Sequence, residues 1–289
     1  MHYTEAKGIL SANNGMNMFR GCTHGCIYCD TRSACYNFTH DFEDVEVKSN
    51  AIDLLAAELS RKRKKCMIGT GAMCDPYIPL ERELGVMRRA MELVLARGFG
   101  MCVQTKSADI LRDLDLIKQI NEKTKFVVQM TLTTADEQLC KKIEPNVSTT
   151  RERVEALKVL RDNGIPTVVW LCPILPYIND TAENITAIVD YCAESGVKGI
   201  INFGMGLTLR EGNREYFYSK LDELFPGLKE KYIGRYGNSY EVNSPIGNSL
   251  TKLFHALCNK YGIMHDNDKI FAYMHEFPEK RFEQIGFNF

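Results

Sequence analysis

Short apolar runs alternate with longer segments of helical periodicity between residues 16 and 203. Each run is a few residues long and apolar on both faces, which is typical of strands in a buried parallel sheet. The predicted strands are 16–20, 67–69, 101–104, 126–131, 167–172 and 199–203. Helical spacing follows in 51–63, 110–120 and 154–161, and the last two are preceded by capping sequences, Ser-Ala-Asp at 107–109 and Ser-Thr-Thr at 148–150. The alternation predicts successive βα units around one parallel sheet.

This pattern predicts an α/β fold, a partial parallel (β/α)6 barrel of the TIM type with a C-terminal helical extension. We expect residues 1–205 to form the barrel and 206–289 to form an extension packed on the barrel opening, with helices near 213–225 and 249–261. The extension is rich in tyrosine and phenylalanine, which we expect to pack a final helix and tail across the open side. A single unit of 289 residues is common for α/β barrels.

Composition and charge limit the classes of protein to which the chain can belong. The chain is 45% hydrophobic and 25% charged, and none of its apolar runs approaches the roughly 20 residues that a membrane span requires. The first ten residues lack the charged and then apolar layout of a secretory signal, so we expect a cytoplasmic protein that is not bound to a membrane. A net charge of −1 removes the strongest sequence argument for nucleic-acid binding. The basic run 61–65 is read as the solvated end of a helix.

A tight cysteine cluster follows the first predicted strand. Cys22, Cys26 and Cys29 have the spacing CxxxCxxC, and three thiolates within eight residues can bind three corners of a [4Fe–4S] cluster. The fourth iron then lacks a protein ligand and can be chelated by a cofactor. A zinc site completed by His24 or Cys35 is the alternative, but zinc usually takes paired cysteine doublets, and the sequence has no second CxxC.

The segment 20–29, Arg-Gly-Cys-Thr-His-Gly-Cys-Ile-Tyr-Cys, resembles the signature of radical S-adenosylmethionine (SAM) enzymes, specifically the spore photoproduct lyase-like group. The similarity extends to Cys-Asp-Pro-Tyr at 74–77 with Glu81, Thr-Lys-Ser at 105–107, Ile-Glu-Pro at 143–145, Cys-Pro-Ile at 172–174 and Asn-Asp at 179–180. The resemblance implies a barrel of the radical SAM type with a [4Fe–4S] cluster and SAM as cofactors. In that family the reduced cluster donates an electron to SAM, and a 5′-deoxyadenosyl radical removes a hydrogen atom from the substrate. An electron donor of the flavodoxin or ferredoxin type is implied as a partner.

The same resemblance assigns residues to SAM. Tyr28 would border the adenine, Cys74 would lie near the methionyl amino group, and Lys106 and Thr131 would hold the carboxylate. Pro173, in the motif after the fifth strand, is carried over as a further cofactor contact. Lys106 could instead be a solvated lysine before a helix, and Thr131 a β-branched strand end.

Two further residues are candidates for catalysis. Cys74 has a readily transferred hydrogen atom close to the expected radical, although a small buried residue that touches SAM is the favoured alternative. Asp75 precedes Pro76, which restricts the backbone of Asp75 and so suits a carboxylate that is fixed at a strand end. The alternative is that Asp75 caps the helix that follows.

Other charged residues near the expected barrel rim have plainer interpretations. Arg153 and Glu144 are expected to form a structural pair. Arg210 and Glu211 lie either at the substrate opening or in a surface loop.

One position departs from the lyase pattern. Spore photoproduct lyases return a hydrogen atom from a cysteine after the second strand, and Ala72 occupies the matching position. Cys74 lies two residues later, a displacement of about 6–7 Å along an extended segment. We therefore expect radical generation rather than thymine-dimer repair.

The substrate is open at this stage. A nucleobase in nucleic acid or a nucleotide is favoured by family analogy alone. A peptide or a small metabolite is the rival substrate, and a non-catalytic iron–sulfur redox or interaction protein is the rival class.

Overall fold

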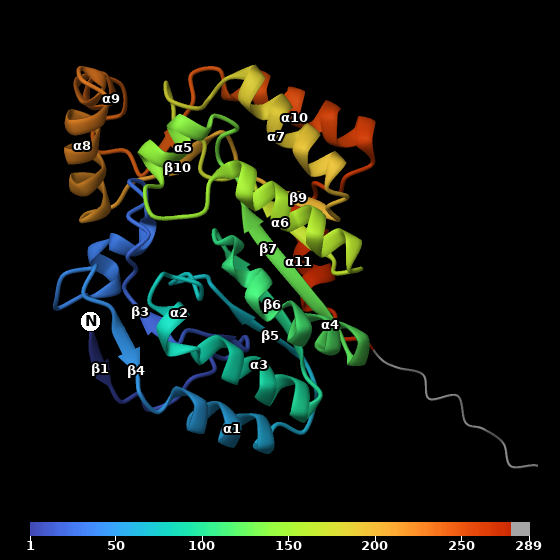
Figure 1. The fold of residues 1–289 in the computed structure, drawn as a ribbon. Coiled ribbons are helices and arrows are strands. Elements are labelled where there is room, and N and C mark those ends of the chain that lie inside the picture. The colour runs from blue at the N-terminus through green and yellow to red at the C-terminus, as the bar shows by residue number, and fades with distance from the viewer. Residues whose placement is uncertain (279–289) are drawn as a thin grey trace, which may run out of the picture.

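Six parallel strands form the central sheet of the computed structural model, which describes residues 1–278 (Figure 1). In spatial order they are β2 (Gly15–Met16), β5 (Met67–Thr70), β6 (Gly100–Thr105), β7 (Phe126–Thr131), β8 (Thr167–Trp170) and β9 (Gly199–Ile201). Each strand pairs in parallel with the next along the chain. This order confirms the predicted parallel α/β architecture, because consecutive βα units that wind in one direction produce it.

The first predicted strand, 16–20, was wrong as a single element. Its start is β2 in the central sheet, whereas its end is β3 (Phe19–Arg20), which pairs antiparallel with β4 (Glu46–Lys48). A third strand, β1 (His2–Thr4), lies parallel to β4 and completes a separate three-stranded sheet. An apolar run does not reveal where a strand changes partners, so the pattern merged the two.

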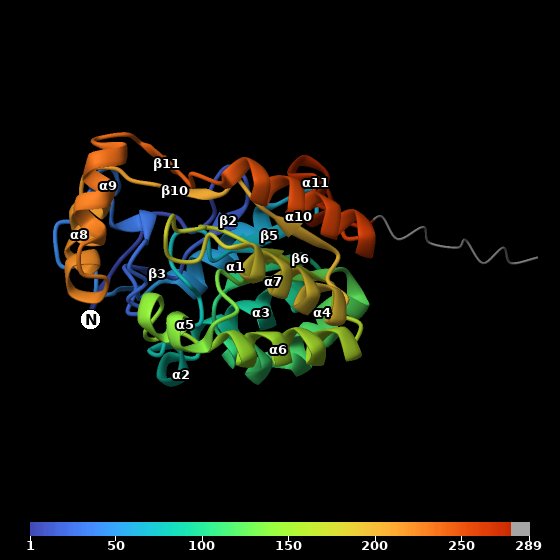
Figure 2. The same ribbon diagram turned by 90° about the horizontal axis from the view of Figure 1, so that it is seen from above.

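Helices cover the convex face of the central sheet (Figures 1 and 2). They are α1 (Ala51–Arg61), α3 (Val86–Arg97), α4 (Leu114–Lys123), α6 (Thr150–Asp162) and α7 (Ala182–Glu194), with the shorter α2 (Glu81–Leu84) and α5 (Glu137–Ile143) at the rim. α1 ends at Arg61, two residues before the predicted end, and the segment before α4 is the 3-10 turn η3 (Ala108–Asp113). α6 begins with a capping box in which Thr149 and Glu152 satisfy each other's backbone, as the predicted cap suggests.

Successive strand residues face opposite sides of the sheet, so the two faces have separate cores. Ile68, Val103, Val128 and Val169 pack against the helices. Met67, Cys102, Val127, Val168 and Ile201 lie on the concave face together with Ile270 and Met274 of α11 (Asn267–His275). α11 therefore fills the concave side near the start of the strands and leaves their C-terminal ends open.

The rest of the C-terminal segment lies beside that open end. β10 (Gly206–Thr208) pairs antiparallel with β11 (Glu241–Asn243), and the chain between them forms α8 (Asn213–Leu224) and α9 (Leu228–Tyr236). α10 (Gly247–Tyr261) follows and packs on α7. The predicted helices at 213–225 and 249–261 are thus present, and the expected tail after residue 278 lies outside the described residues. Within residues 1–278, no helix is long and apolar enough to cross a membrane.

Candidate active site

A cavity of about 630 Å³ lies at the C-terminal ends of the central strands. One wall is the cysteine loop, residues 21–29. The other walls come from the loops after β5, β6 and β8, from the end of β7 and from the β10–β11 hairpin. The sequence-predicted site residues all line it: Cys22, Cys26, Tyr28, Cys29, Cys74, Asp75, Lys106, Thr131 and Pro173. The fold therefore brings together residues that are up to 151 positions apart, Cys22 and Pro173 being the extremes.

Backbone contacts fix the shape of the cysteine loop. Gly21 has φ +86°, and a Cβ there would lie 2.5 Å from the carbonyl oxygen of Phe42, so only glycine fits without a shift. The same carbonyl accepts a hydrogen bond from the Cys22 N–H at 3.1 Å. At the far side of the loop, the Ile27 N–H donates to the Ile143 carbonyl at 3.0 Å. These contacts hold the three cysteines toward one cavity.

The cysteine thiols have different electrostatic surroundings. A hydrogen bond with Cys74 lowers the pKa of Cys22 to about 6, and the nearby His24 acts in the same direction. Burial raises the pKa of Cys26 and of Cys29, with the positive charge of Lys106 opposing the rise at both. A bound metal deprotonates a coordinating thiol, so iron would stabilise the thiolates that burial alone disfavours.

Cys74 is buried beside the cysteine loop. Its Sγ lies 2.8 Å from the carbonyl oxygen of Gly21, to which the thiol donates. The pKa of Cys74 is raised well above its usual range, first by the hydrogen bond with Cys22 and then by burial, so this thiol keeps its proton. Its roles as a SAM contact and as a hydrogen-atom donor stay predictions.

Two polar groups in the cavity make no side-chain hydrogen bond within residues 1–278. Thr131 is 2% exposed, and its Oγ1 has no hydrogen-bond partner in the described residues. Lys106 makes no side-chain hydrogen bond or ion pair there, and its Nζ lies 6.0 Å from the centre of the Tyr28 ring. Although burial lowers the pKa of Lys106, the negative charges of Cys26, Glu144 and Asp75 raise it overall, so the ammonium stays charged. A charged donor and a free hydroxyl in one pocket suit a carboxylate ligand, as SAM has.

Asp75 connects the loops that follow β5 and β6. Its Oδ1 accepts from the Thr105 hydroxyl at 2.7 Å and from the Tyr77 N–H at 2.9 Å, while its Oδ2 accepts from the Lys106 N–H at 2.7 Å. His24 Nδ1 lies 3.4 Å from the same Oδ2. These contacts favour a role in placing Lys106, and the predicted catalytic role of Asp75 stays a prediction.

Tyr28 is anchored by a buried ion pair. Its hydroxyl donates to Glu144, and Glu144 also pairs with Arg153, as the sequence predicted for the latter two. The side chains of Glu144 and Arg153 are both 0% exposed, and Arg153 Nη1 also donates to the Thr131 carbonyl at 2.7 Å. The backbone of Thr131 and the ring of Tyr28 are therefore held by one buried network.

The cavity also contains residues that the sequence did not single out as ligand contacts. Trp170, Phe203, Tyr240 and Glu241 line it, and Phe203 is 63% exposed although it is large and apolar. Trp170 and Phe203 fall at the ends of β8 and β9, a position that marks site residues in parallel barrels and was the available signal. Tyr240 accepts a hydrogen bond from Arg210 at 2.9 Å, which places Arg210 at the mouth.

The family comparison matches residues 16–192 to the radical SAM superfamily. Curated relatives cover most of the chain. A Mycobacterium tuberculosis protein described as uncharacterized is 28% identical over 260 residues, which are 87% of this chain and 75% of that protein. A protein of the Acidianus two-tailed virus, also described as uncharacterized, is 26% identical over 275 residues, 90% of this chain and 84% of that one.

Solved structures share the fold. A spore photoproduct lyase complexed with a dinucleoside spore photoproduct superposes with a TM-score of 0.65 at 15% identity, covering 86% of this chain and 74% of that one. A radical S-adenosylmethionine methyltransferase of Kitasatospora setae, with cobalamin and a [4Fe–4S] cluster bound, has a TM-score of 0.57 at 12% identity and covers 84% of this chain and 52% of that one. At these identities the likeness concerns the fold.

Proposed function

Because the chain belongs to the radical SAM superfamily, we propose that it cleaves SAM at a cluster held by Cys22, Cys26 and Cys29 and uses the resulting radical on a ring-containing substrate. The observation that carries this proposal is the convergence, in one cavity, of the three cysteines with the Thr131 hydroxyl and the Lys106 ammonium, neither of which has a side-chain hydrogen-bond or ion-pair partner among residues 1–278. A buried hydroxyl without a partner costs stability. Its presence in the same cavity as the Lys106 ammonium is explained by a ligand that both groups bind.

Membership of the superfamily confirms three predictions made from the motif. The family itself is confirmed, together with the class of the protein, an enzyme of radical chemistry. The cofactors, a [4Fe–4S] cluster and SAM, are those of the family. When bound, they supply the one-electron cleavage that yields a carbon-centred radical, and the chain supplies ligands, orientation and exclusion of water.

The residues around the cofactors would act by binding and orientation. Lys106 and Thr131 would hold the carboxylate of SAM, since their donors face the cavity without competing partners. Tyr28 would present its ring to the adenine, with its hydroxyl tied to Glu144. Asp75 would fix the Lys106 backbone, which keeps the ammonium in place for binding.

The aromatic lining of the cavity supports a nucleobase or nucleotide as the favoured substrate. Trp170, Phe203 and Tyr240 present aromatic surface there, and base–aromatic stacking stabilises by about 1–3 kcal/mol per base. The spore photoproduct lyase of similar fold is complexed with a dinucleoside photoproduct. The substrate proposed for this chain is different from a thymine dimer, because Ala72 supplies no thiol at the position of the lyase's donor.

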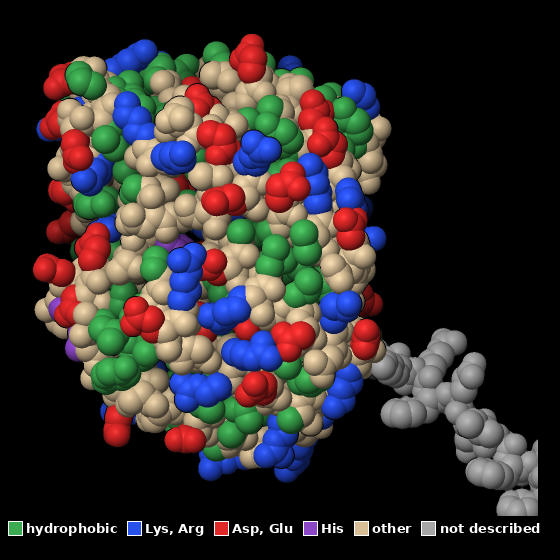
Figure 3. All heavy atoms as spheres, in the orientation of Figure 1, with side chains coloured by type: hydrophobic (Ala, Val, Ile, Leu, Met, Phe, Trp, Pro, Cys, Tyr) green, Lys and Arg blue, Asp and Glu red, His purple; other side chains and the backbone are tan. Residues whose placement is uncertain are grey.

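The charge of the cavity favours a substrate with few phosphates, which keeps a small metabolite or a peptide as the second candidate. Its lining includes the carboxylates Asp30, Asp75 and Glu241 and one lysine, Lys106. On the face shown in Figure 3, acidic and basic side chains are interspersed over most of the surface. A long polyanion usually needs a basic track, so we favour a nucleoside or mononucleotide over duplex nucleic acid.

The reaction needs an external reductant, for which we propose an electron donor of the flavodoxin or ferredoxin type. We also propose a cytoplasmic location. All eleven cysteines are free thiols in the structure, and a reducing compartment keeps thiols in that state.

The test is anaerobic reconstitution with iron and sulfide, followed by reduction with dithionite in the presence of SAM. We expect about four irons per chain and formation of 5′-deoxyadenosine. Cys29→Ala should lose both the cluster and SAM cleavage. Cys66→Ala is the matched control, because Cys66 lies outside the cavity lining, and it should retain both. A full cluster with no 5′-deoxyadenosine would contradict the proposal.

A further inference from the structure

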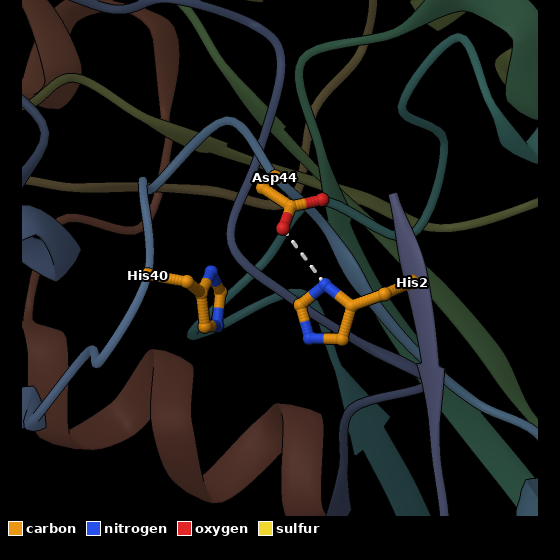
Figure 4. A group of neighbouring side chains, drawn as sticks. All are labelled: His2, His40 and Asp44. Carbon is orange, nitrogen blue, oxygen red and sulfur yellow. Dashed lines mark hydrogen bonds and ion pairs between the residues drawn. The ribbon is translucent and has the colours of Figure 1, made fainter.

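A second group of metal-ligating side chains lies outside the cavity, where β1 meets the loop before β4. His2, His40 and Asp44 each offer one ligand atom, and these atoms all lie within 4.8 Å of one another (Figure 4). His2 Nδ1 is 2.9 Å from Asp44 Oδ2, and the rings of His2 and His40 meet edge to face with their centres 4.8 Å apart. The three are partly buried, so a metal ion can reach them from solvent.

The donor set matches zinc. Two imidazoles and one carboxylate are common zinc ligands, with Zn–N and Zn–O distances of about 2.0–2.2 Å. Tetrahedral geometry then places ligand atoms about 3.4 Å apart. The ligand atoms of His2 and Asp44 are 2.9 Å apart, a hydrogen-bond distance that has to open by about 0.5 Å, and His40 has to move closer by a side-chain rotation. We propose that His2, His40 and Asp44 form a zinc site whose fourth ligand is water.

The surroundings of His40 provide the support that a metal-bound imidazole usually has. Its Nε2 lies 2.7 Å from Glu46 Oε1, and its Nδ1 lies 2.9 Å from the Asp41 carbonyl. Zinc binding would replace one of these two contacts of the His40 ring with a bond to the metal. If the Glu46 contact is kept, the carboxylate orients the ring while the other nitrogen binds the metal, as in carboxylate–histidine–zinc triads. Glu46 is itself held by Arg20 at 3.0 Å.

The backbone brings the ligands together before any metal arrives. β1 and β4 are parallel, with His2 opposite Glu46, and the His2 N–H donates to the Val45 carbonyl at 3.1 Å. The loop that carries His40 and Asp44 therefore leads directly into a fixed strand pair. Pre-arranged ligands lose little conformational entropy on binding, which favours affinity.

The position of this site suggests what the metal does. The loop that carries His40 and Asp44 also carries Phe42, whose carbonyl accepts the hydrogen bond from the Cys22 N–H at 3.1 Å. Zinc would cross-link β1 to this loop and so restrain the backbone that supports the first cluster ligand. This cross-linking role does not depend on which substrate the enzyme takes.

The test uses the reconstituted, cluster-bound protein, in which iron occupies the cysteine loop. After removal of loosely bound metal with a mild chelator, Zn²⁺ is titrated against a chromophoric competitor, and bound zinc is counted by elemental analysis. We expect one zinc per chain in excess of the cluster. His40→Ala and Asp44→Ala should each weaken binding on the order of 100-fold, since two remaining ligands are too few for a stable site.

His255→Ala is the matched control. His255 and His265 form another surface histidine pair, with ring centres 5.1 Å apart, but they belong to no three-ligand group in the described residues. This variant should bind zinc like the wild type. Zinc should also raise the melting temperature of the wild type and leave that of His40→Ala unchanged. Absence of zinc binding, equal loss in the control, or unchanged affinity in both ligand variants would overturn the proposal.

Discussion

Tyr28 donates its hydroxyl hydrogen to the carboxylate of Glu144, and the same carboxylate pairs with Arg153. Tyr28, which lies between Cys26 and Cys29, is thus joined to a fully buried ion pair whose Glu144 is 116 positions further along the chain. Burial and the charge of Glu144 raise the pKa of Tyr28 well above its usual range, so the phenol stays a donor.

The first prediction separates the two contacts of Glu144. Tyr28→Phe removes one hydrogen bond to a buried charge and should lower the free energy of unfolding by about 1.5–3 kcal/mol. Glu144→Gln leaves the Arg153 guanidinium buried without a counter-charge and should cost more, about 3–5 kcal/mol. Anaerobic urea unfolding measures both, with Tyr3→Phe as the control because Tyr3 is 58% exposed. Equal losses in the two variants would contradict the network.

The second prediction concerns Asp75 as a positioning residue. In Asp75→Asn, an amide NH₂ replaces one of the oxygens that accept from the Lys106 N–H and the Thr105 hydroxyl. The Lys106 loop should shift, so KM for SAM should rise on the order of tenfold, with kcat nearly unchanged. If Asp75 transfers a proton instead, kcat should fall by about 10²-fold or more at constant KM. Steady-state rates of 5′-deoxyadenosine formation distinguish the two, and Asp109→Asn serves as the control.

The sequence predicted the strands and the residues of the candidate site better than the contacts between the loops that carry those residues. The strands and the cysteine loop could be predicted because buried strands are apolar and because ligands of one cluster are often close in sequence. The contact of Asp75 with the Lys106 N–H spans 31 positions and depends on how two loops meet, which no local pattern encodes. The position of Trp170 and Phe203 at or just after strand ends was a usable signal, but Tyr240 joins them only through the hairpin of β10 and β11, which no local pattern places there.

The division of residues 16–20 between two sheets shows a second limit of predicting strands from hydrophobicity. Met16 and Phe19 are both buried, so hydrophobicity is equal on either side of the break. The partner changes because β3 pairs with β4, a strand that lies 26 positions later. The three-ligand group of His2, His40 and Asp44 arises from that same small sheet, and it was invisible in the sequence for the same reason.

A third prediction follows from the exposed pair of Asp115 and Arg88, which joins α4 to α3. Arg88 donates to both oxygens of Asp115, at 2.9 and 2.7 Å, and lowers the pKa of Asp115 from 3.8 to about 2. A lowered folded pKa means that the pair stabilises the fold above about pH 4 and that this contribution is lost as the pH falls toward 2. Asp115→Asn should therefore reduce stability near neutral pH, by no more than about 1 kcal/mol because the pair is solvent-screened. The difference from the wild type should shrink below pH 4 in urea unfolding, and a constant difference would contradict this account.

The last prediction uses the unpartnered Thr131 hydroxyl. Thr131→Val keeps the shape of the side chain and removes a buried polar group that has no hydrogen-bond partner among residues 1–278, so stability should stay constant or rise by up to about 1 kcal/mol. SAM binding should weaken by about tenfold, because the lost hydrogen bond is one to a charged carboxylate. Lys106→Met removes a charged contact and should weaken SAM binding further, by roughly 10- to 100-fold. Equilibrium dialysis of SAM against the anaerobic, cluster-bound protein measures both, with the exposed Lys118→Met as the charge-matched control. If Thr131→Val lowers stability and leaves SAM affinity unchanged, the hydroxyl serves the fold, and the proposed contact of Thr131 with SAM is wrong.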